Sequence, residues 1–334
     1  MVTPLTGELS SWGNAIRKGL EIAREKIKDI KLTIIFEDSK CEPKEAVSAV
    51  QKLINVDKVK IIIGTVCSSE TLAIAPITEA NSVILMSIGA SSPKITYAGD
   101  YVFRMWPSDV YEAGLLVDYI SKNLPGIKKI DVLYINNDFG MHFKDAVIKF
   151  SKDSGLNIGT VESFNPGSSD FKPQLTKIKQ SDSNALFVIT YTDEAYALFK
   201  QIREFNLEKQ LFAPGWVIED KNFLEKSKEL INGVIFAVPN VQINENFRNK
   251  MVSKYGSEGE NLLVSGLAYD GFNIIIESLK TCGEKTSCIR DKLYNTKDYN
   301  GVTGSVTFDD NGDIINRPYV IKKVINSAIE EITK

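Results

Sequence analysis

Short apolar runs alternate with segments of helical periodicity along the first hundred residues of this chain. Three segments place apolar residues every three or four positions, as one face of a helix does, and a short apolar run follows each of them. The predicted helix and strand pairs are 16–30 with 31–36, 46–54 with 59–63, and 72–77 with 83–87. Alternation of this kind needs a parallel sheet covered by helices on both faces, which predicts an α/β fold.

The alternation starts again after residues 103–109. The predicted helices are 110–123, 141–152 and 193–205, and the predicted strands are 129–135, 184–190 and 233–238. A chain of 334 residues also exceeds the roughly 250 to 300 that one hydrophobic core usually serves. Two doubly wound parallel sheets therefore predict two lobes, with the carboxyl ends of both strand sets facing one cleft.

Residues 261–295 return to a helical pattern and are too many for the second lobe alone. We therefore expect the chain to cross back to the first lobe, so that each lobe is built from discontinuous segments. The predicted lobe 1 is 1–107 plus 239–309, and the predicted lobe 2 is 108–238 plus 310–334. A multi-strand hinge near Pro107, Pro239 and 310–317 would join them.

Composition argues against several classes of function. A net charge of −3 with no basic block makes nucleic-acid binding unlikely to be the function, and no window approaches the roughly 18 apolar residues of a membrane span. A single histidine, with no nucleophile elbow, P-loop or metal-ligand spacing, predicts no enzyme, no cofactor and no metal. The stretch "DDNGD" at 309–313 predicts a turn between "GSVTF" and "RPYVIKKV" rather than a calcium loop, because its glycine is misplaced for calcium.

The four cysteines fall in two groups, Cys41 with Cys67 and Cys282 with Cys288. If Cys41 and Cys67 end neighbouring strands, their side chains meet at the sheet edge, and "TCGEKTSC" forms a small loop that a second bridge could close. This favours two disulfides and an oxidising compartment over reduced core thiols or a metal site. The start Met1-Val2-Thr3 resembles the tail of a strand, so we expect that an upstream segment, with a targeting sequence, was removed.

The stretch "GTVCSSET" at 64–71 follows a buried strand and precedes a predicted helix. Hydroxyls at this place lie beside free backbone N–H groups, where the helix dipole favours an anion. From these residues alone, two roles stay open for Ser68 and Ser69: capping their own helix, or contacting a ligand.

Five motifs in order along the chain resemble the type I periplasmic binding proteins, in particular the branched-chain amino-acid-binding group of ABC transporters. They are "PLTGELSSWG" at 4–13, "GTVCSSET" at 64–71, "SIGASSPKIT" at 87–96, "FRMWPSD" at 103–109 and "NNDFG" at 136–140. The resemblance implies that Ser68 donates to a ligand carboxylate and that Gly89 and Ala90 contact the ligand through their backbone. It also implies that the N–H and hydroxyl of Ser91 hold the same carboxylate and the ligand ammonium.

The resemblance also implies aromatic contacts. Trp12 matches a position that often packs on the ligand, and Phe139 and Tyr191 match aromatic positions of the second lobe. Trp216 would join them around the cleft. Ordinary core packing is the alternative role for each of these side chains.

One departure from the family pattern affects the ligand. Relatives that bind α-amino acids commonly place an acid where this chain has Pro214 or Gly215. An ammonium buried without a partner would be costly, so either Asp109 supplies the charge or the ligand is not an α-amino acid. Asp109 could equally cap the helix that starts at Val110. Glu219 and Asp220 should lie beyond the rim of the pocket.

The resemblance therefore predicts a solute-binding protein that captures a small carboxylate by lobe closure and delivers it to the membrane permease subunits of an ABC transporter. The alternatives are a sensor ectodomain of the same fold, or a binder of aromatic carboxylates or amides. The expected location is extracytoplasmic, in the periplasm or at the cell surface. A lipid anchor on the removed N-terminal segment is one way to attach the protein to the membrane.

Overall fold

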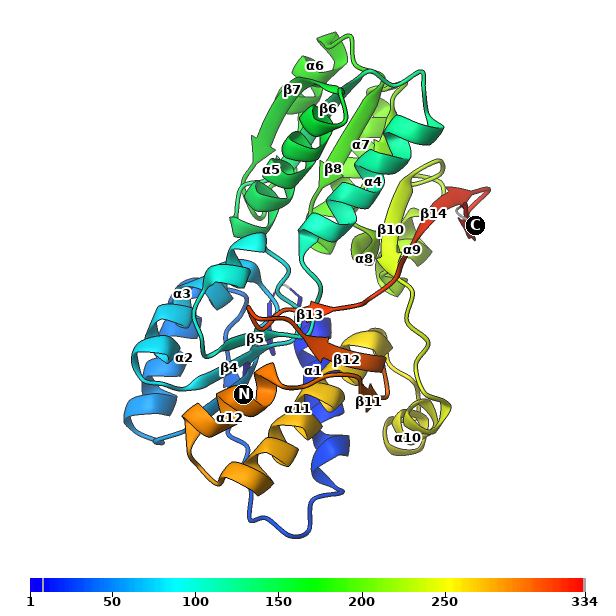
Figure 1. Cartoon of the computed structure of the whole chain (residues 1–334). Coiled ribbons are helices and arrows are strands. Elements are labelled where there is room, and N and C mark those ends of the chain that lie inside the picture. Colours follow the sequence, from blue (N-terminus) through cyan, green and yellow to red (C-terminus); the bar gives the residue numbers. More distant parts are fainter. Residues whose placement is uncertain (8, 333–334) are drawn as a thin grey trace. The chain divides into compact units, whose positions relative to one another are not determined.

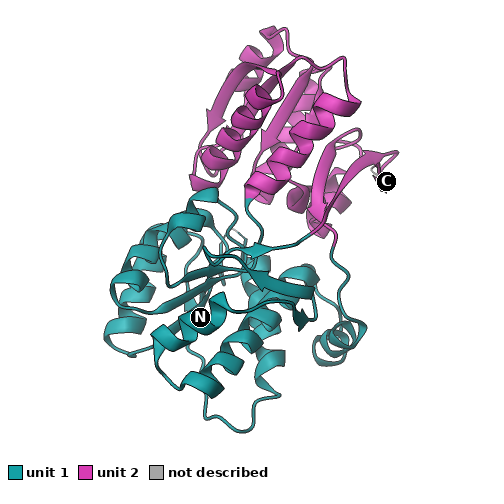
Figure 2. Cartoon of the chain, viewed as in Figure 1, with its two compact units in different colours: residues 1–108, 241–317 teal, residues 109–240, 318–334 magenta. Residues whose placement is uncertain are grey.

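A computed structural model describes residues 1–7 and 9–332 of the chain (Figure 1). The residues divide into two compact units, each built from two stretches of chain (Figure 2). Unit 1 comprises 1–108 and 241–317, and unit 2 comprises 109–240 and 318–334. The chain thus passes between the units three times.

These bounds differ most from the sequence-based ones at residues 310–317, which we expected in lobe 2. They belong to unit 1 because Ile314 and Ile315 pair with the preceding strand, at Phe308 and Thr307. The turn at 309–313 lies where we expected a turn, since the N–H of Asp309 donates to Asp313 O and the N–H of Gly312 donates to Asp309 O. It leads into the short strand at 314–315, whereas "RPYVIKKV" forms a strand of unit 2.

Unit 1 contains a parallel five-stranded sheet of order β2-β1-β3-β4-β5. Its strands are β1 (Val2–Thr3), β2 (Glu37–Asp38), β3 (Ile61–Gly64), β4 (Ile84–Ser87) and β5 (Val102–Arg104), and a smaller antiparallel sheet contains β11 (Tyr299–Gly301), β12 (Gly304–Phe308) and β13 (Ile314–Ile315). The helices are α1 (Ser10–Arg24), α2 (Pro43–Asn55), α3 (Ser68–Ala80), the 3₁₀ helix η1 (Pro93–Tyr97), α10 (Glu245–Tyr255), α11 (Leu262–Cys282) and α12 (Thr286–Tyr294). Helix α1 packs against α11 and α2 against α3, so each helix pair shields apolar side chains from water.

Residues 31–36 were expected as a buried strand, and this expectation is wrong. The ladder with β1 covers only Glu37 and Asp38, and residues 31–36 are mostly half-buried or exposed. An apolar cavity of about 90 Å³ lies beside them, lined also by β3 and by Phe272 and Ile275 of α11. All of its lining residues except Thr33 have apolar side chains, so they offer few partners to a carboxylate ligand.

Unit 2 contains a seven-stranded sheet of order β15-β14-β10-β9-β8-β6-β7, parallel from β10 to β7 and antiparallel at β14 and β15. Its strands are β6 (Lys129–Ile135), β7 (Asn157–Phe164), β8 (Ala185–Ile189), β9 (Gln210–Phe212), β10 (Ile235–Pro239), β14 (Tyr319–Ile325) and β15 (Ala328–Glu331). The helices are α4 (Asp109–Asn123), α5 (Asp138–Asp153), α6 (Lys172–Gln180), α7 (Thr192–Glu204), α8 (Gly215–Ile218) and α9 (Lys221–Ser227). Strand β8 is entirely apolar and buried, as expected for a central parallel strand with both faces covered.

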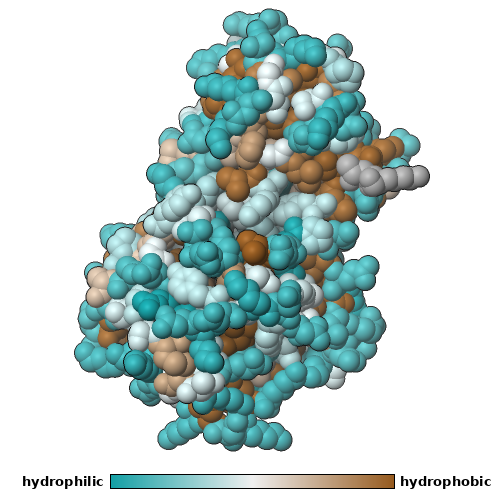
Figure 3. Space-filling model, viewed as in Figure 1, coloured by the Kyte–Doolittle hydropathy of each residue, from teal (hydrophilic) through white to brown (hydrophobic). Residues whose placement is uncertain are grey.

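Helix α11 is long and apolar enough to cross a membrane, which we did not expect from the sequence. However, 72% of its apolar window is buried inside the structure, as in the core helix of a folded unit. The visible face of each unit carries mostly hydrophilic side chains, with apolar ones in small separate groups (Figure 3).

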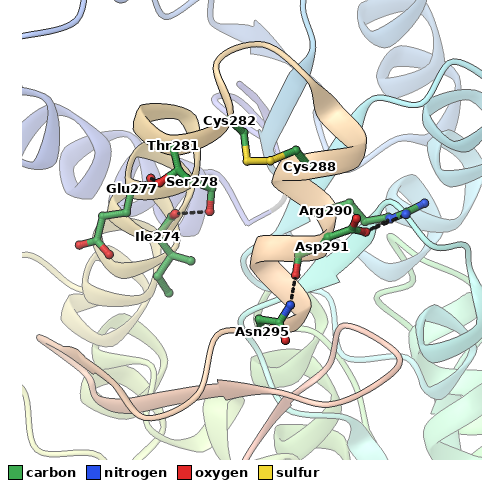
Figure 4. The surroundings of a disulfide bond; sticks show 9 residues. All are labelled: Ile274, Glu277, Ser278, Thr281, Cys282, Cys288, Arg290, Asp291 and Asn295. Carbon is green, nitrogen blue, oxygen red and sulfur yellow. Dashed lines mark hydrogen bonds and ion pairs between the residues drawn. A yellow bond between two sulfur atoms is a disulfide. The ribbon is translucent and has the colours of Figure 1, made fainter.

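Both predicted cysteine pairs are disulfides in the structure. Cys41 joins Cys67 with their Cα atoms 5.5 Å apart, and Cys282 joins Cys288 at 5.7 Å. The second bridge closes the loop between α11 and α12, as Figure 4 shows. The first joins the segment after β2 to the residue that directly precedes α3.

Candidate functional site

The polar segments expected to bind a ligand leave one edge of the unit 1 sheet. Strands β3 and β4 end in register, with Gly64 opposite Ser87. The chain after β3 enters α3, and the chain after β4 runs through Gly89 to Ser92. Because the carboxyl ends of neighbouring parallel strands meet at one edge, both segments emerge side by side.

The N-terminus of α3 is capped by residues other than the serines. Cys67 is the N-cap residue, and the buried carboxylate of Glu70 accepts hydrogen bonds from the N–H groups of Val66 and Cys67, at 2.6 and 3.0 Å. Burial raises the pKa of Glu70, while these bonds act against the rise. The capping role considered for Ser68 and Ser69 is therefore filled by Cys67 and Glu70.

Ser68 instead connects the two segments. Its hydroxyl oxygen accepts a hydrogen bond from the backbone N–H of Ser92, at 3.1 Å. Ser68 and Ser91 are almost completely buried, with 2% and 5% of their surface exposed. We name Ser68, Ser91 and Ser92 the serine edge of unit 1; it brings hydroxyls and a helix N-terminus together, which is chemistry suited to an anion.

Trp12 of α1 lies against the same edge. A Cβ atom at Gly89 would meet Trp12 Cε3 at 3.2 Å and Val66 Cα at 3.2 Å, so glycine lets the indole approach the backbone. Trp12 also packs on Trp106, with ring centroids 5.1 Å apart. The structure thus places Trp12, Gly89 and the serine edge together. Ala90, which lies between Gly89 and Ser91 in the sequence, is also buried.

The three aromatic residues expected from the second lobe gather in unit 2. Phe139, Tyr191 and Trp216 follow β6, β8 and β9, each within four residues of the strand end. The rings of Phe139 and Tyr191 are stacked with centroids 5.2 Å apart, and Trp216 lies 5.8 Å from each of them. We name these residues the aromatic cluster. Phe139 and Tyr191 are buried and Trp216 is half-buried, so packing and ligand contact are both compatible with their burial.

Gly215, one of the two residues that we matched to the acidic position of the family, leaves no room for a side chain. A Cβ atom at residue 215 would lie 2.1 Å from the backbone oxygen of Ala237 on β10, so no side chain fits there. The N–H of Gly215 donates to the carboxylate of Glu112 on α4, at 2.8 Å.

Glu112 is a candidate that the sequence reasoning missed. Its side chain is buried, and desolvation, together with the nearby charges of Asp109 and Glu219, raises its pKa well above the usual value. The signal in the sequence was its spacing, since it follows Asp109 by three residues and therefore lies on the same side of α4.

The other acids take separate positions. Asp109 is buried and is the first residue of α4, so the helix starts one residue earlier than the capping alternative assumed. Glu219 pairs with Lys322 at 2.7 Å. Asp220 caps α9 by accepting from the N–H of Phe223 at 2.9 Å, which gives it a structural role.

The sequence and the structure were compared with known proteins. Residues 1–328 match the model of the family described as periplasmic binding protein. A Pseudomonas aeruginosa protein named leucine-, isoleucine-, valine-, threonine- and alanine-binding protein is 24% identical over 95% of this chain and 87% of its own.

Two solved structures illustrate the likeness of fold. A leucine-binding protein from Thermotoga maritima aligns over 99% of this chain and 96% of its own, with 24% identity and a TM-score of 0.89. A solute-binding protein of an ABC transporter from Rhodopseudomonas palustris, solved with 3,4-dihydroxybenzoic acid, aligns over 100% and 96%, with 23% identity and a TM-score of 0.81. The chain therefore belongs to the periplasmic binding protein family, with the type I fold and relatives in its branched-chain amino-acid-binding group.

Proposed function

We propose that this protein is the extracytoplasmic solute-binding protein of an ABC transporter and that it captures a small carboxylate, an amino acid or a related compound. The hydrogen bond between Ser68 and Ser92 is the observation that carries the proposal. It places two hydroxyl segments and the N-terminus of α3 at one sheet edge, where the helix dipole and backbone N–H groups stabilise a carboxylate without a fixed positive charge.

In this proposal the ligand carboxylate docks first on unit 1, through Ser68, Ser91 and the backbone of Gly89 and Ala90, with Trp12 against its apolar part. Unit 2 then closes over the ligand, and Phe139, Tyr191 and Trp216 complete the enclosure. Closure is a population shift, which the ligand stabilises because it contacts both units only in the closed state. The three chain crossings between the units would serve as the hinge.

For an α-amino acid, the proposed partner of the ammonium is the acidic pair Asp109 and Glu112 at the start of α4. Both carboxyls are buried, and Glu112 accepts a hydrogen bond from Gly215, one of the two residues that we matched to the acidic position of the family. A cation beside them would stabilise their charged form, which offsets part of the cost of burying both groups.

A second ligand class is favoured by the aromatic cluster. Three rings with centroids within 6 Å of one another, one of them next to Gly215, where no acidic side chain fits, suit an aromatic carboxylate. The Rhodopseudomonas palustris protein with 3,4-dihydroxybenzoic acid shows that the fold accommodates such a ligand. In this case burial of the ring would supply most of the affinity, at about 25 cal/mol per Å².

The membrane permease subunits of the transporter are the proposed partners, because they would bind the closed form. The protein would lie in the periplasm or at the cell surface, and a lipid anchor is one way to hold it there. Signalling by a sensor of the same fold is the competing role. An upstream lipobox or signal peptide would favour transport, and a downstream membrane span followed by a signalling domain would favour sensing.

A thermal-shift screen tests the ligand proposal. The protein is first unfolded and refolded to remove carried-over ligand, and is then heated with leucine, isoleucine, valine, benzoate, 3,4-dihydroxybenzoate or neutral amides. A micromolar ligand at millimolar concentration should stabilise by about 4 kcal/mol, which gives a clear shift in Tm. Stabilisation by aliphatic amino acids supports the first ligand class and stabilisation by benzoates the second. Stabilisation by amides alone would contradict a carboxylate site.

A further inference from the structure

The guanidinium of Arg104, at the end of β5, is completely buried beside the serine edge. Its Nη1 donates to the backbone oxygens of Ser91 and Ser92, at 3.2 and 2.9 Å. Its Nε and Nη2 both donate to the carboxylate of Asp313, at 2.5 Å each. Nη2 also donates to the hydroxyl oxygen of Thr96, at 2.8 Å. A buried guanidinium thus has partners for each of its nitrogens.

The hydrogen bond from Arg104 to the oxygen of Ser91 affects the hydrogen bond between Ser92 and Ser68. The oxygen of Ser91 and the N–H of Ser92 belong to one peptide group, which is planar and rigid. Arg104 holds the oxygen side of this group, and Ser68 accepts from its N–H side. The orientation of the peptide, and with it the geometry offered to a carboxylate, therefore depends on where the guanidinium lies.

Asp313, at the other end of this hydrogen-bond network, lies in the segment that leads into unit 2. The backbone N–H of Arg104 donates to the backbone oxygen of Gly312 at 3.0 Å. The hydroxyl of Thr96 donates to the carboxylate of Asp313 at 2.7 Å. The N–H of Asp313 donates to the carboxylate of Asp309, at 2.9 Å, which closes the turn at 309–313. Four residues after Asp313 the chain leaves unit 1.

We propose that Arg104 and Asp313 form a positioning pair that couples the serine edge to the segment 309–317, which connects the two units. Displacing the Ser91–Ser92 peptide moves the oxygens that hold the guanidinium, and the bidentate pair passes this displacement to Asp313. Ligand binding at the serine edge and the conformation of the connecting segment are then linked by one buried side chain. The inference rests on the proposed function, because it gives these residues a role in ligand-driven closure.

Asp313→Asn tests the pair, because it removes the charge while keeping the shape of the side chain. Asp131→Asn in unit 2 is the matched control, since Asp131 is a buried aspartate that pairs with a lysine of its own unit, Lys209, at 3.1 Å. Asp131→Asn should lower Tm without changing ligand affinity.

The first measurement is amide hydrogen exchange of Ser92, which needs no ligand. Asp313→Asn should increase its exchange rate at least tenfold, whereas Asp131→Asn should leave it unchanged. An unchanged rate in Asp313→Asn would overturn the positioning role, whether or not the protein binds a carboxylate.

The second measurement uses whichever of leucine and benzoate binds the wild-type protein. Asp313→Asn should weaken binding at least tenfold and reduce the ligand-dependent decrease in radius of gyration seen by X-ray scattering. Equal weakening in Asp131→Asn would show a general loss of stability and refute the coupling. If neither compound binds the wild type, the proposed function fails in its present form and the exchange measurement alone decides the role of the pair.

Discussion

The carboxylate of Glu112 accepts a hydrogen bond from the backbone N–H of Gly215, 2.8 Å away and 103 residues later in the chain. The bond fixes the segment that carries Trp216. A carboxyl group from α4 therefore lies beside Gly215, where no side chain fits.

Glu112 should make the stability of the protein depend on pH. Its pKa in the folded state is raised above the usual value of 4.5, because burial disfavours the charged form. A raised carboxyl pKa contributes stability that is present below the unfolded-state pKa and is lost as pH rises through the folded-state pKa. Glu112→Gln keeps an acceptor for Gly215 and removes the titration, so its free energy of unfolding should exceed that of the wild type increasingly as pH rises above about 5.

Denaturant unfolding of both proteins at several pH values between 4 and 8 measures this difference. Glu204→Gln, on the exposed end of α7, is the control and should give a curve parallel to the wild type. A constant difference between Glu112→Gln and the wild type across this range would show that Glu112 does not titrate in it.

Removing the serine hydroxyls should weaken ligand binding and leave the fold intact. Ser68→Ala with Ser91→Ala deletes the proposed hydrogen bonds to a charged carboxylate, each worth about 1.5–3 kcal/mol, so affinity should fall more than tenfold. Titration calorimetry with the ligand found in the screen measures the change. Ser48→Ala, on the exposed face of α2, is the control. Undiminished affinity in the double variant would refute the carboxylate site.

Tyr191, the N-cap residue of α7, and Tyr196, inside the same helix, offer a matched pair. Tyr191 is 4% exposed and stacks on Phe139, whereas Tyr196 on α7 is 45% exposed. Tyr191→Ala should weaken binding by about tenfold, because it removes apolar contact and aromatic stacking worth about 0.5–1.5 kcal/mol. Tyr196→Ala should bind like the wild type. Both are measured well below the Tm of the variants, and equal affinities would assign Tyr191 to packing alone.

The two disulfides should differ in their effect on stability and on binding. Cys41 and Cys67 are 26 residues apart and Cys282 and Cys288 only 6. Loop-closure entropy then predicts losses of about 3.5 and about 2.2 kcal/mol when each bridge is replaced by serines. Only the first replacement should also weaken ligand binding, because Cys67 directly precedes Ser68. Thermal unfolding and titration of both double variants check this, and a larger binding defect in the Cys282/Cys288 variant would contradict it.

Filling the apolar cavity of unit 1 should stabilise the protein. Val59 lines the cavity and Val56 is 71% exposed, so Val59→Ile adds a methylene to apolar surroundings and Val56→Ile adds one to water. Val59→Ile should increase the free energy of unfolding by about 0.8 kcal/mol, and Val56→Ile by close to zero. A decrease in Val59→Ile would mean that the cavity cannot take the extra volume without strain.

Much of the fold could be predicted from local sequence. Helices such as α2 and α7 follow from apolar spacing, and the buried strands β6 and β8 from short apolar runs between turns, because these patterns reflect which side of one element faces a core. Both cysteine pairs were predicted correctly, but the assumption that Cys41 and Cys67 follow neighbouring strands is wrong, because β1 lies between β2 and β3. The expected ligand residues remain predictions, although those of unit 1 lie together at one sheet edge and the three aromatic residues of unit 2 form one cluster.

The sequence by itself determined the α/β class, the return of the chain to its first unit, the two disulfides and the family. Only the tertiary structure decided that Ser68 accepts from Ser92, that no side chain fits at Gly215, that Glu112 lies beside it, and that residues 310–317 belong with unit 1. The physical reason is the range of these interactions. Periodicity reports on neighbours three or four residues away, whereas the contacts of Ser68, Glu112 and Arg104 join residues 24, 103 and 209 positions apart. Such contacts depend on the register of the strands and on which backbones come close enough to exclude a side chain.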